Sequence, residues 1–507
     1  MVNLCVGTRK FKEGGNMADF LIRMEGVNLS SVLDDTTQLS VIRGSSLLLR
    51  KAVVKVGGEF KLDVISVGAS IGLYQYSEFG DTTISKLLEG IVDWLSTSKN
   101  RNGFEYFTFV VDAVEASDDF NRDVKTLISK NRKRQMQQMT FSLPQTGFLV
   151  IDNQAACAWN GTTPACKKIT DPKIYLSPSV FHRFTEGKNE RQKFFKNEIG
   201  DAAKGLTFTD DLQTLAKNRD YGSLDGKIAV IYFDGNSFGT IKNNCCKNPK
   251  SYTAFDDAVQ NKLKKFLSTL LNTAIDDQGF KSGKQIRLEV LLWGGDEILI
   301  VVPAWRGFQT LQLFYEAMQG AQFNNEPLTF AGGIVFSQAN TPIYRLRNLA
   351  KELADGVKER VIKENAFDYL ILESIDYPSE PIAVLRERIY QDKVKGYKVL
   401  YPFDQNKIEQ VQNYIDEGYL SKTSVTSLAF TAIQKPGKFE EKKKRLISLL
   451  KYKTIINELE NLFIGSARQD LRSMILRVVH GSINIWPWIH LAQLWDYLFI
   501  TEPGEKA

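Results

Sequence analysis

The sequence lacks long hydrophobic runs. No stretch of eighteen apolar residues occurs in its 507 residues, whereas a helix that spans a bilayer needs about twenty. The first residues also lack the apolar stretch and the small-residue cleavage site of a secretory signal. These absences argue against a membrane-spanning helix and a secretory leader, so we expect a cytoplasmic protein with no membrane partner.

Cysteine and histidine are scarce, with five and three residues respectively. Five cysteines in a chain of this length do not form a disulfide framework, which agrees with a reducing compartment. Neither sign of charge is in large excess, because 65 Lys and Arg residues nearly balance 59 Asp and Glu residues and leave a net charge of only +6. Such a balance permits contact with nucleotides or nucleic acid without requiring it.

The remaining composition is that of an ordinary globular protein, with 43% hydrophobic and 24% charged residues. At about 100 to 200 residues per domain, the length predicts three or four domains. The informative feature is therefore the placement of a few acidic residues rather than the overall composition.

An acidic pair lies between two strongly apolar runs in residues 288–302. Such runs on both sides of a Gly-Gly pair are typical of a β-hairpin, which places Asp296 and Glu297 at its tip. A lone Gly-Gly-Asp-Glu sequence is more often a turn with two solvated acids. Mg²⁺ prefers hard oxygen ligands, however, and usually takes one or two carboxylates together with substrate phosphates. The pair therefore predicts a metal site if a second acidic strand lies beside it.

Residues 227–239 supply that second strand. Its apolar run ends on Asp234, and Gly235 allows a ligand to approach the backbone closely. A long helix separates this strand from the hairpin, and a helix over residues 306–319 and a strand over residues 328–336 follow it. This β-α-β-β-α-β order is the split arrangement in which the end of the first strand and the hairpin tip are neighbours. The combination favours a metal site over unrelated turns.

The sequences FDGNSFG and WGGDEI resemble the palm of nucleotide cyclases and polymerases. GGDEF-type diguanylate cyclases share this palm with the large subunit of type III CRISPR effector complexes. Several other stretches are similar to the CRISPR subunit rather than to bacterial diguanylate cyclases: residues 177–183, 191–195, 198–200, 332–344 and 349–351. The resemblance covers about residues 150–380 closely and the flanks loosely.

Residues 17–150 repeat the same order of elements, which predicts a second α+β unit. Aligning the two copies by this order puts Glu25 where Asp234 lies, and residues 68–70 where residues 295–297 lie. The first copy then has one acid and lacks the hairpin pair. We therefore expect a degenerate palm with a structural role, which could still form one wall of a nucleotide pocket.

The predicted fold class is α+β, with two tandem ferredoxin-like palm domains and a C-terminal helical domain. The expected boundaries are 17–150 for the degenerate palm, 151–205 for a linker, 206–380 for the active palm with the GGDE motif, and 381–507 for the helical domain. In the last of these, the basic run at 442–445 is typical of a solvated helix face, although it could contact RNA or a partner subunit. The aromatic segment 485–499 is more typical of core than of a base-stacking surface.

The linker contains Cys157 and Cys166, with His182 farther along. The segment resembles the zinc knuckle that the family has there, but Asn160 stands where a second cysteine is expected. Structural zinc takes four Cys or His ligands. Three candidates at loose spacing favour a remnant without metal.

The resemblance implies a two-metal nucleotidyl transfer. Asp234, Asp296 and Glu297 would be the catalytic and metal-binding residues, with the Gly235 carbonyl as a further ligand. They would hold two Mg²⁺ or Mn²⁺ ions about 3.5 to 4 Å apart, which activate a 3′-hydroxyl and stabilise the leaving pyrophosphate. The residues expected to bind the nucleotide are Gly235, Asn236, Ser237, Phe238, Gly294, Gly295, Lys351 and Lys358.

The resemblance further implies ATP as the substrate and a cyclic oligoadenylate, or a related cyclic nucleotide, as a second messenger in antiviral defence. The large CRISPR subunit often carries an HD nuclease, yet none of the three histidines is followed by Asp, which excludes that nuclease. The chain is also short for that subunit. It could be a stand-alone synthase, for example a homo-oligomer, or a member of a complex with guide RNA, target RNA and other effector subunits.

Two other functions stay open. One is a non-catalytic scaffold of a type III CRISPR complex that binds RNA and partner subunits and has a vestigial palm. The other is a diguanylate cyclase, which the base of the product would distinguish. The presence of Asp234, Asp296 and Glu297 in one palm, while the other lacks its hairpin acids, favours an active enzyme.

Overall fold

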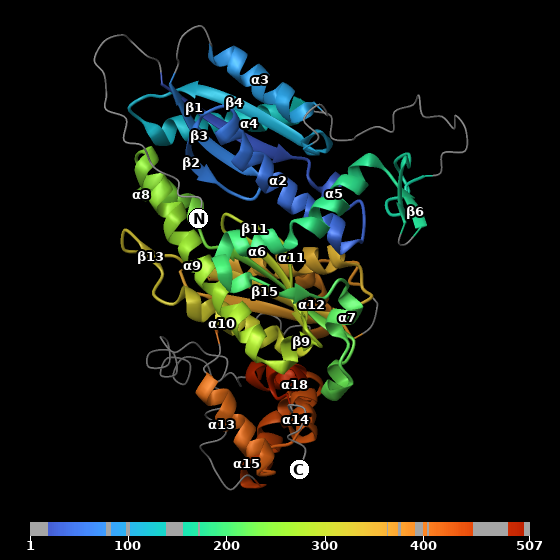
Figure 1. Cartoon of the computed structure of the whole chain (residues 1–507). Coiled ribbons are helices and arrows are strands. Elements are labelled where there is room, and N and C mark those ends of the chain that lie inside the picture. The colour runs from blue at the N-terminus through green and yellow to red at the C-terminus, as the bar shows by residue number, and fades with distance from the viewer. Residues whose placement is uncertain are drawn as a thin grey trace.

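The computed structural model describes ten segments of the chain: residues 19–77, 83–97, 102–137, 156–170, 173–361, 363–373, 377–390, 399–402, 405–449 and 485–500. Figure 1 shows a blue N-terminal α+β unit at one end, a green and yellow α+β unit in the middle, and orange and red helices at the other end. Among the described helices, none combines the length and the hydropathy that crossing a bilayer requires.

The first α+β unit is built on an antiparallel sheet with the strand order β2-β3-β1-β4. Two of its helices cover one face, around Ile22, Met24 and Tyr74, and a third helix covers the other face, around Leu21 and Leu73. The elements are β1 (Asp19–Val27), α2 (Leu39–Glu59), β2 (Asp63–Val67), β3 (Ile71–Ser77), α3 (Ile84–Ser96), β4 (Thr108–Glu115) and α4 (Phe120–Gln137).

The second α+β unit has the strand order β11-β12-β8-β15-β16. Its first four strands repeat the order of the first unit, so both units have the split arrangement that the sequence predicts. Helices α9 and α10 cover one face of this sheet, and α11 covers the other. The elements are β8 (Lys227–Gly235), α9 (Pro249–Asp276), β11 (Glu289–Gly294), β12 (Glu297–Pro303), α10 (Gly307–Met318), β15 (Phe330–Gln338), α11 (Ile343–Arg360) and β16 (Ala366–Ile371).

The register corrects the alignment of the two copies by one residue. Glu25 is paired with Ile71 between β1 and β3, and Phe233 is paired with Ile298 between β8 and β12. Continuing the second ladder puts Asp234 opposite Glu297, so Ile71 occupies the position of Glu297. The expected match of residues 68–70 with residues 295–297 is wrong, because element order does not specify a turn to one residue. The first hairpin still lacks both acids.

Helix α11 begins at Ile343, and Pro342 is its N-cap. The Thr341 and Ser337 hydroxyls are hydrogen-bonded to each other at 2.8 Å. Apolar residues recur every three or four positions along α9, and six of them are buried against the sheet: Phe255, Val259, Leu263, Phe266, Leu267 and Leu270.

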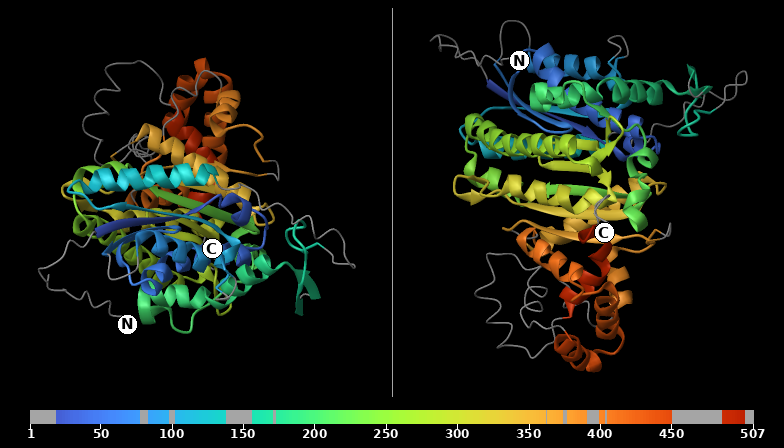
Figure 2. Two further views of the ribbon diagram at one scale, coloured as in Figure 1. Left: turned by 90° about the horizontal axis from the view of Figure 1, so that it is seen from above. Right: turned by 60° about the horizontal axis from the view of Figure 1, so that its bottom comes forward.

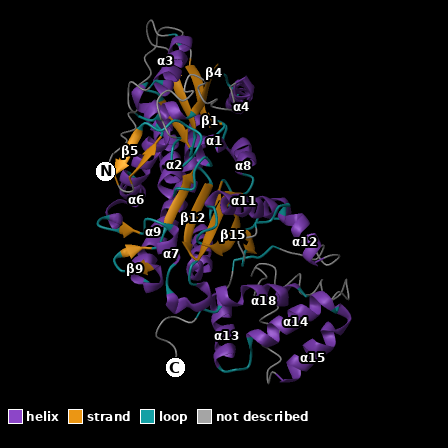
Figure 3. Cartoon of the chain, turned by 90° about the vertical axis from the view of Figure 1, so that its right-hand side faces the viewer, coloured by secondary structure: helices purple, strands orange, loops and turns teal. Residues whose placement is uncertain are grey.

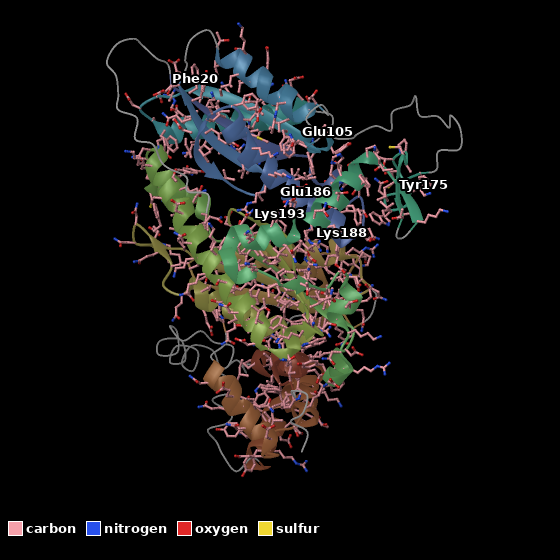
Figure 4. All side chains as sticks on the ribbon, viewed as in Figure 1. Phe20, Glu105, Tyr175, Glu186, Lys188 and Lys193 are labelled. Atoms are coloured by element: carbon pink, nitrogen blue, oxygen red, sulfur yellow. The ribbon has the colours of Figure 1, made fainter. Side chains whose placement is uncertain are left out.

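The two α+β units are joined through α5 (Pro178–Asn189), which packs along α2. The two helices cross at Gly44 and Gly187, where a Cβ added to Gly44 would lie 1.8 Å from the Arg183 carbonyl oxygen. Figure 4 labels Glu186 on this helix and Lys193 on α6 (Arg191–Ile199), at the junction between the units. Only glycine permits such a close crossing.

An arginine of α2 reaches across the same junction. Arg43 donates to both carboxylate oxygens of Glu289 on β11 at 2.5 and 2.6 Å, and to the Gly187 carbonyl at 2.7 Å. Arg191 lies 2.9 Å from the same carboxylate. The base of the β11–β12 hairpin is therefore tied to the first unit by a buried, charge-assisted contact.

The described residues of the C-terminal part, which include 405–449 and 485–500, are largely helical, as expected. The described helices of this part are α12 (Ile382–Tyr390), α13 (Gln405–Asp416), α14 (Lys422–Gln434), α15 (Phe439–Leu449) and α18 (Trp486–Leu498). The ring of Tyr497 lies 4.2 Å from that of Phe336 on β15, and Trp488 is buried. The aromatic segment is therefore core, and Figure 2 shows these helices against the second unit. Lys442 in the basic run bonds Ser427 and Thr431 of α14.

Candidate active site

Two of the three predicted carboxylates lie in a tight hairpin turn. Gly295 and Asp296 form the two-residue turn between β11 and β12, and Glu297 is the first residue of β12. Gly295 has a φ of +63°, a conformation that glycine adopts without strain and that two-residue hairpins require. Because β12 pairs with β8, this turn lies beside Asp234 at the end of β8.

Asp234 is largely buried and is paired with a lysine. The Lys358 ammonium of α11 lies 2.5 Å from its Oδ2. Burial raises the pKa of Asp234 to about 6, Lys358 opposes this shift, and the negative charges of Asp296 and Glu297 add to it. The site therefore concentrates negative charge in a place with little water, which a cation would relieve.

Asp296 has a different cationic neighbour. Burial raises its pKa, and the charge of Lys242 is the largest influence in the opposite direction. Lys242 lies on α8 (Phe238–Cys245), 2.8 Å from Asp256 and 4.5 Å from the centre of the Tyr252 ring. Sequence reasoning missed Lys242. Lys242 lies four residues after Phe238, on the first helix after the strand that carries Asp234, and this spacing places both residues on one helix face. That spacing was the sequence signal available for Lys242.

Helix α11 presents a second predicted lysine to the site. Lys351 lies two helical turns before Lys358, and its ammonium is 6.0 Å from the centre of the Tyr232 ring. Tyr232 is on the same face of β8 as Asp234, two residues away. Its hydroxyl is buried and makes no regular hydrogen bond to the described residues, although Glu297 lies within its reach. Tyr232 was not predicted as a site residue.

The loop after Asp234 holds the other predicted residues, and their side chains point to different surroundings. The Asn236 amide is buried and donates to the Thr329 hydroxyl at 3.0 Å and to the Glu364 carbonyl at 3.2 Å. Ser237 is exposed, with a φ of +57°. The Phe238 ring is packed against Phe255 and Phe330. The Phe238 ring is therefore part of the core, and a role for residue 238 in nucleotide binding stays a prediction.

Three of the predicted glycines are required by packing or by the turn. A Cβ on Gly235 would lie 2.6 Å from the Phe238 ring, and a Cβ on Gly294 would lie 2.5 Å from the backbone of Ala69 in the first unit. The Gly295 carbonyl accepts a hydrogen bond from Gln260 of α9 at 3.0 Å. These contacts alone account for glycine at 235 and 294, whether or not a nucleotide binds there.

The carboxylates fit a divalent cation that binds together with a nucleotide. Within the segments the structure describes, no group of three or more Asp, Glu, His or Cys side chains is placed to hold a metal by itself. Mg²⁺ commonly takes one or two protein carboxylates and completes its shell with phosphates and water. Asp234 and Asp296 are suitable ligands, and the Lys358 ammonium stands where a cation would neutralise Asp234.

The three linker residues considered as zinc ligands, Cys157, Cys166 and His182, lie in different surroundings. Cys157 is buried and Cys166 is exposed, and the His182 ring lies 5.7 Å from that of Tyr106. The Asn160 side chain accepts hydrogen bonds from Thr162 and Thr163, with the Thr163 hydroxyl at 3.0 Å. Asn160, at the position where a second cysteine is expected, therefore stabilises the loop through these hydrogen bonds.

Residues 227–367 match the family model described as the second palm domain of Cas10/Cmr2. Over these residues the chain is similar to a Cas10-type palm domain. This domain begins with β8 and includes Asp234, Asp296, Glu297, Lys351 and Lys358, so the convergent carboxylates and both lysines lie inside the matched segment. No curated protein sequence matches the chain.

Solved structures share the fold over nearly the whole chain. An apo Csm1–Csm4 cassette matches with a TM-score of 0.52 at 12% identity, over 96% of this chain and 70% of that chain. The same cassette in complex with cA4 matches with a TM-score of 0.51 at 14% identity, with the same coverage. A complex with one ATP matches with a TM-score of 0.50 at 12% identity, again over 96% and 70%. The fold around the palm domain is thus also similar.

Proposed function

We propose that the chain is a nucleotidyltransferase that converts ATP into a cyclic oligoadenylate-type second messenger for antiviral defence. The observation that carries this proposal is the convergence of Asp234, Asp296 and Glu297 below two lysines of α11, within a Cas10-type palm. Csm1–Csm4 cassettes of similar fold have been solved with ATP and with cA4. That likeness supports the choice of an adenine nucleotide.

The acidic residues and the lysines of the site would have different roles. Mg²⁺ or Mn²⁺ bound by Asp234, Asp296 and Glu297 would make the attacking 3′-hydroxyl more acidic and neutralise charge on the departing pyrophosphate. Lys351 and Lys358 would hold the triphosphate, since both are on the helix face that overlies the acids. The backbone at Gly235 and Gly295 permits close approach of the ligand. Positioning and electrostatics would supply most of the rate.

The first unit would then be a degenerate palm that forms one wall of the pocket. Its strand order repeats that of the first four strands of the second unit, and its hairpin turn meets the β11–β12 hairpin where Ala69 contacts Gly294. Glu25 is already paired with Arg23 at 2.5 Å and with Arg132 at 3.3 Å. We assign residues 17–150 to this palm, 151–205 to the linker, 206–380 to the active palm and 381–507 to the helical domain.

The partners that fit this assignment are ATP, other subunits of a type III CRISPR complex, and guide or target RNA. A scaffold role is the second candidate, and one observation favours it: Lys358 forms an ion pair with Asp234. A structural ion pair of this kind would suffice for a vestigial palm. The two candidates differ in whether nucleotide and metal displace that pair.

The test is incubation of the purified protein with labelled ATP or GTP and Mg²⁺ or Mn²⁺, first alone and then with partner subunits and target RNA. Products are identified by mass spectrometry, beside the double variant Asp234→Ala with Asp296→Ala. A cyclic adenylate made by the wild type and lost in the variant supports the proposal, and a guanylate would indicate a diguanylate cyclase. No product under any condition would favour the scaffold.

A further inference from the structure

The turn that carries Asp296 is held by a side chain of α9. The Gln260 amide donates to the Gly295 carbonyl at 3.0 Å. One helical turn earlier, Asp256 holds Lys242 at 2.8 Å, and the charge of Lys242 acts on Asp296. The same face of α9 therefore contacts the turn directly and also fixes its nearest cationic neighbour.

The other side of this turn is packed against the first unit. A Cβ placed on Gly294 would lie 2.5 Å from the Ala69 backbone nitrogen and Cα, so the two hairpins touch at their tips. The first-unit turn is itself held, because Gly26 donates to the Ser70 carbonyl at 2.8 Å. Thr253 of α9 donates to the Ile65 carbonyl of β2 at 2.8 Å. Helix α9 and the first unit thus contact each other, and both contact the β11–β12 hairpin near its Gly295–Asp296 turn.

We propose that Gln260 and Ala69 are positioning residues that set where Asp296 stands relative to Asp234 and Glu297. This inference rests on the proposed function and explains how a unit without hairpin acids contributes to the site. The pairing of β12 with β8 places Glu297 beside Asp234. Asp296 lies in the two-residue turn beyond this ladder, so contacts from outside the hairpin help to fix its position. Small displacements of groups that hold a metal or substrate reduce catalysis strongly.

The first test uses Gln260→Leu, which removes the donor and keeps a side chain of similar bulk. Mn²⁺ is titrated by electron paramagnetic resonance in the presence of a non-hydrolysable ATP analogue. We expect the Kd for Mn²⁺ to rise about threefold to tenfold, the size of one lost hydrogen bond. Gln260→Lys, which restores a donor, should recover most of the affinity. The matched control is Gln192→Leu, since Gln192 makes a similar bond to the Leu206 carbonyl away from the site.

The second test uses Ala69→Leu, which enlarges the contact with Gly294 from the side of the first unit. We expect weaker Mn²⁺ binding and, where product forms, a lower kcat with little change in KM for ATP. The control is Val92→Leu on the exposed face of α3. Unfolding temperatures within a few degrees of the wild type would show that the effect is local.

The outcomes separate this inference from the proposed function. Wild-type Mn²⁺ affinity in both Gln260→Leu and Ala69→Leu would overturn the positioning role, whatever the activity. If the wild type makes no product under any condition, but its Mn²⁺ affinity depends on Gln260 and Ala69, the proposed function fails and the positioning role stands. Mn²⁺ binding that is unchanged by Asp296→Ala would overturn both.

Discussion

Lys358 and Asp234 form a 2.5 Å ion pair across the contact between α11 and β8. Lys358 is proposed to bind phosphate and Asp234 is proposed to bind metal. The ion pair between them must therefore break before either residue can bind its proposed ligand. Figure 3 shows α11 beside the sheet that contains β12 and β15. An ammonium group and the proposed divalent cation would therefore compete for one carboxylate.

This competition predicts opposite effects of Lys358→Met on two measurements. Without nucleotide at pH 8, Mn²⁺ should bind about threefold to tenfold more tightly, because the variant removes a partly buried positive charge that competes for Asp234. With ATP as the substrate, KM should rise, because a phosphate contact is lost. Isothermal titration and steady-state kinetics measure the two effects. Weaker Mn²⁺ binding in the variant would show that Lys358 supports the metal site instead.

A second prediction concerns pH. Burial raises the pKa of Asp234 from 3.8 to about 6, so between these values the folded protein binds a proton that the unfolded chain releases. The contribution of this residue to the free energy of unfolding therefore decreases as pH rises from about 4 to 6. Thermal unfolding of the wild type and Asp234→Asn, compared from pH 4 to pH 7, measures it. A difference that stays constant across this range would contradict the raised pKa.

A third prediction concerns the junction between the units. Arg43→Ala leaves the carboxylate of Glu289, which is 1% exposed, with Arg191 as its remaining ionic partner in the described chain. Removing one partner of a buried ion pair typically costs about 3 to 5 kcal/mol, and the remaining arginine should keep the loss near the lower value. Urea unfolding measures it.

The control for Arg43→Ala is Lys193→Ala at the same junction. Lys193 is 65% exposed and pairs with Glu190 three residues away. Exposed pairs of this kind contribute little to stability, because water screens the charges. Equal losses in the two variants would mean that the Arg43 contact does not hold the units together.

The sequence was sufficient for features that depend on local pattern. The Gly-Gly turn, the strand that ends on Asp234 and the apolar face of α9 follow from turn chemistry and periodicity. Lys242 and Tyr232 were missed because their importance comes from packing between elements. The burial of the Phe238 ring also could not be predicted, because neighbouring loop positions can face opposite directions. The one-residue shift at Ser70 arose because register depends on hydrogen bonding that sequence order does not specify.

The crossing of α2 and α5 gives the last prediction. A methyl group at Gly44 would lie 1.8 Å from the Arg183 carbonyl oxygen, which is backbone and cannot move aside alone. Gly44→Ala should therefore separate the helices and lower the free energy of unfolding by several kcal/mol, at the upper end of overpacking effects of about 1 to 3 kcal/mol. Gly58→Ala in the same helix meets nothing within 4 Å. It should stabilise the protein by about 0.5 to 1 kcal/mol, because alanine favours helix.

Because Arg43 precedes Gly44, separation of the helices should also disturb the Arg43–Glu289 contact. The variant that combines Gly44→Ala with Arg43→Ala should therefore lose less stability than the sum of the losses in the two single variants. Strict additivity in urea unfolding would show that the crossing and the ion pair hold the units independently.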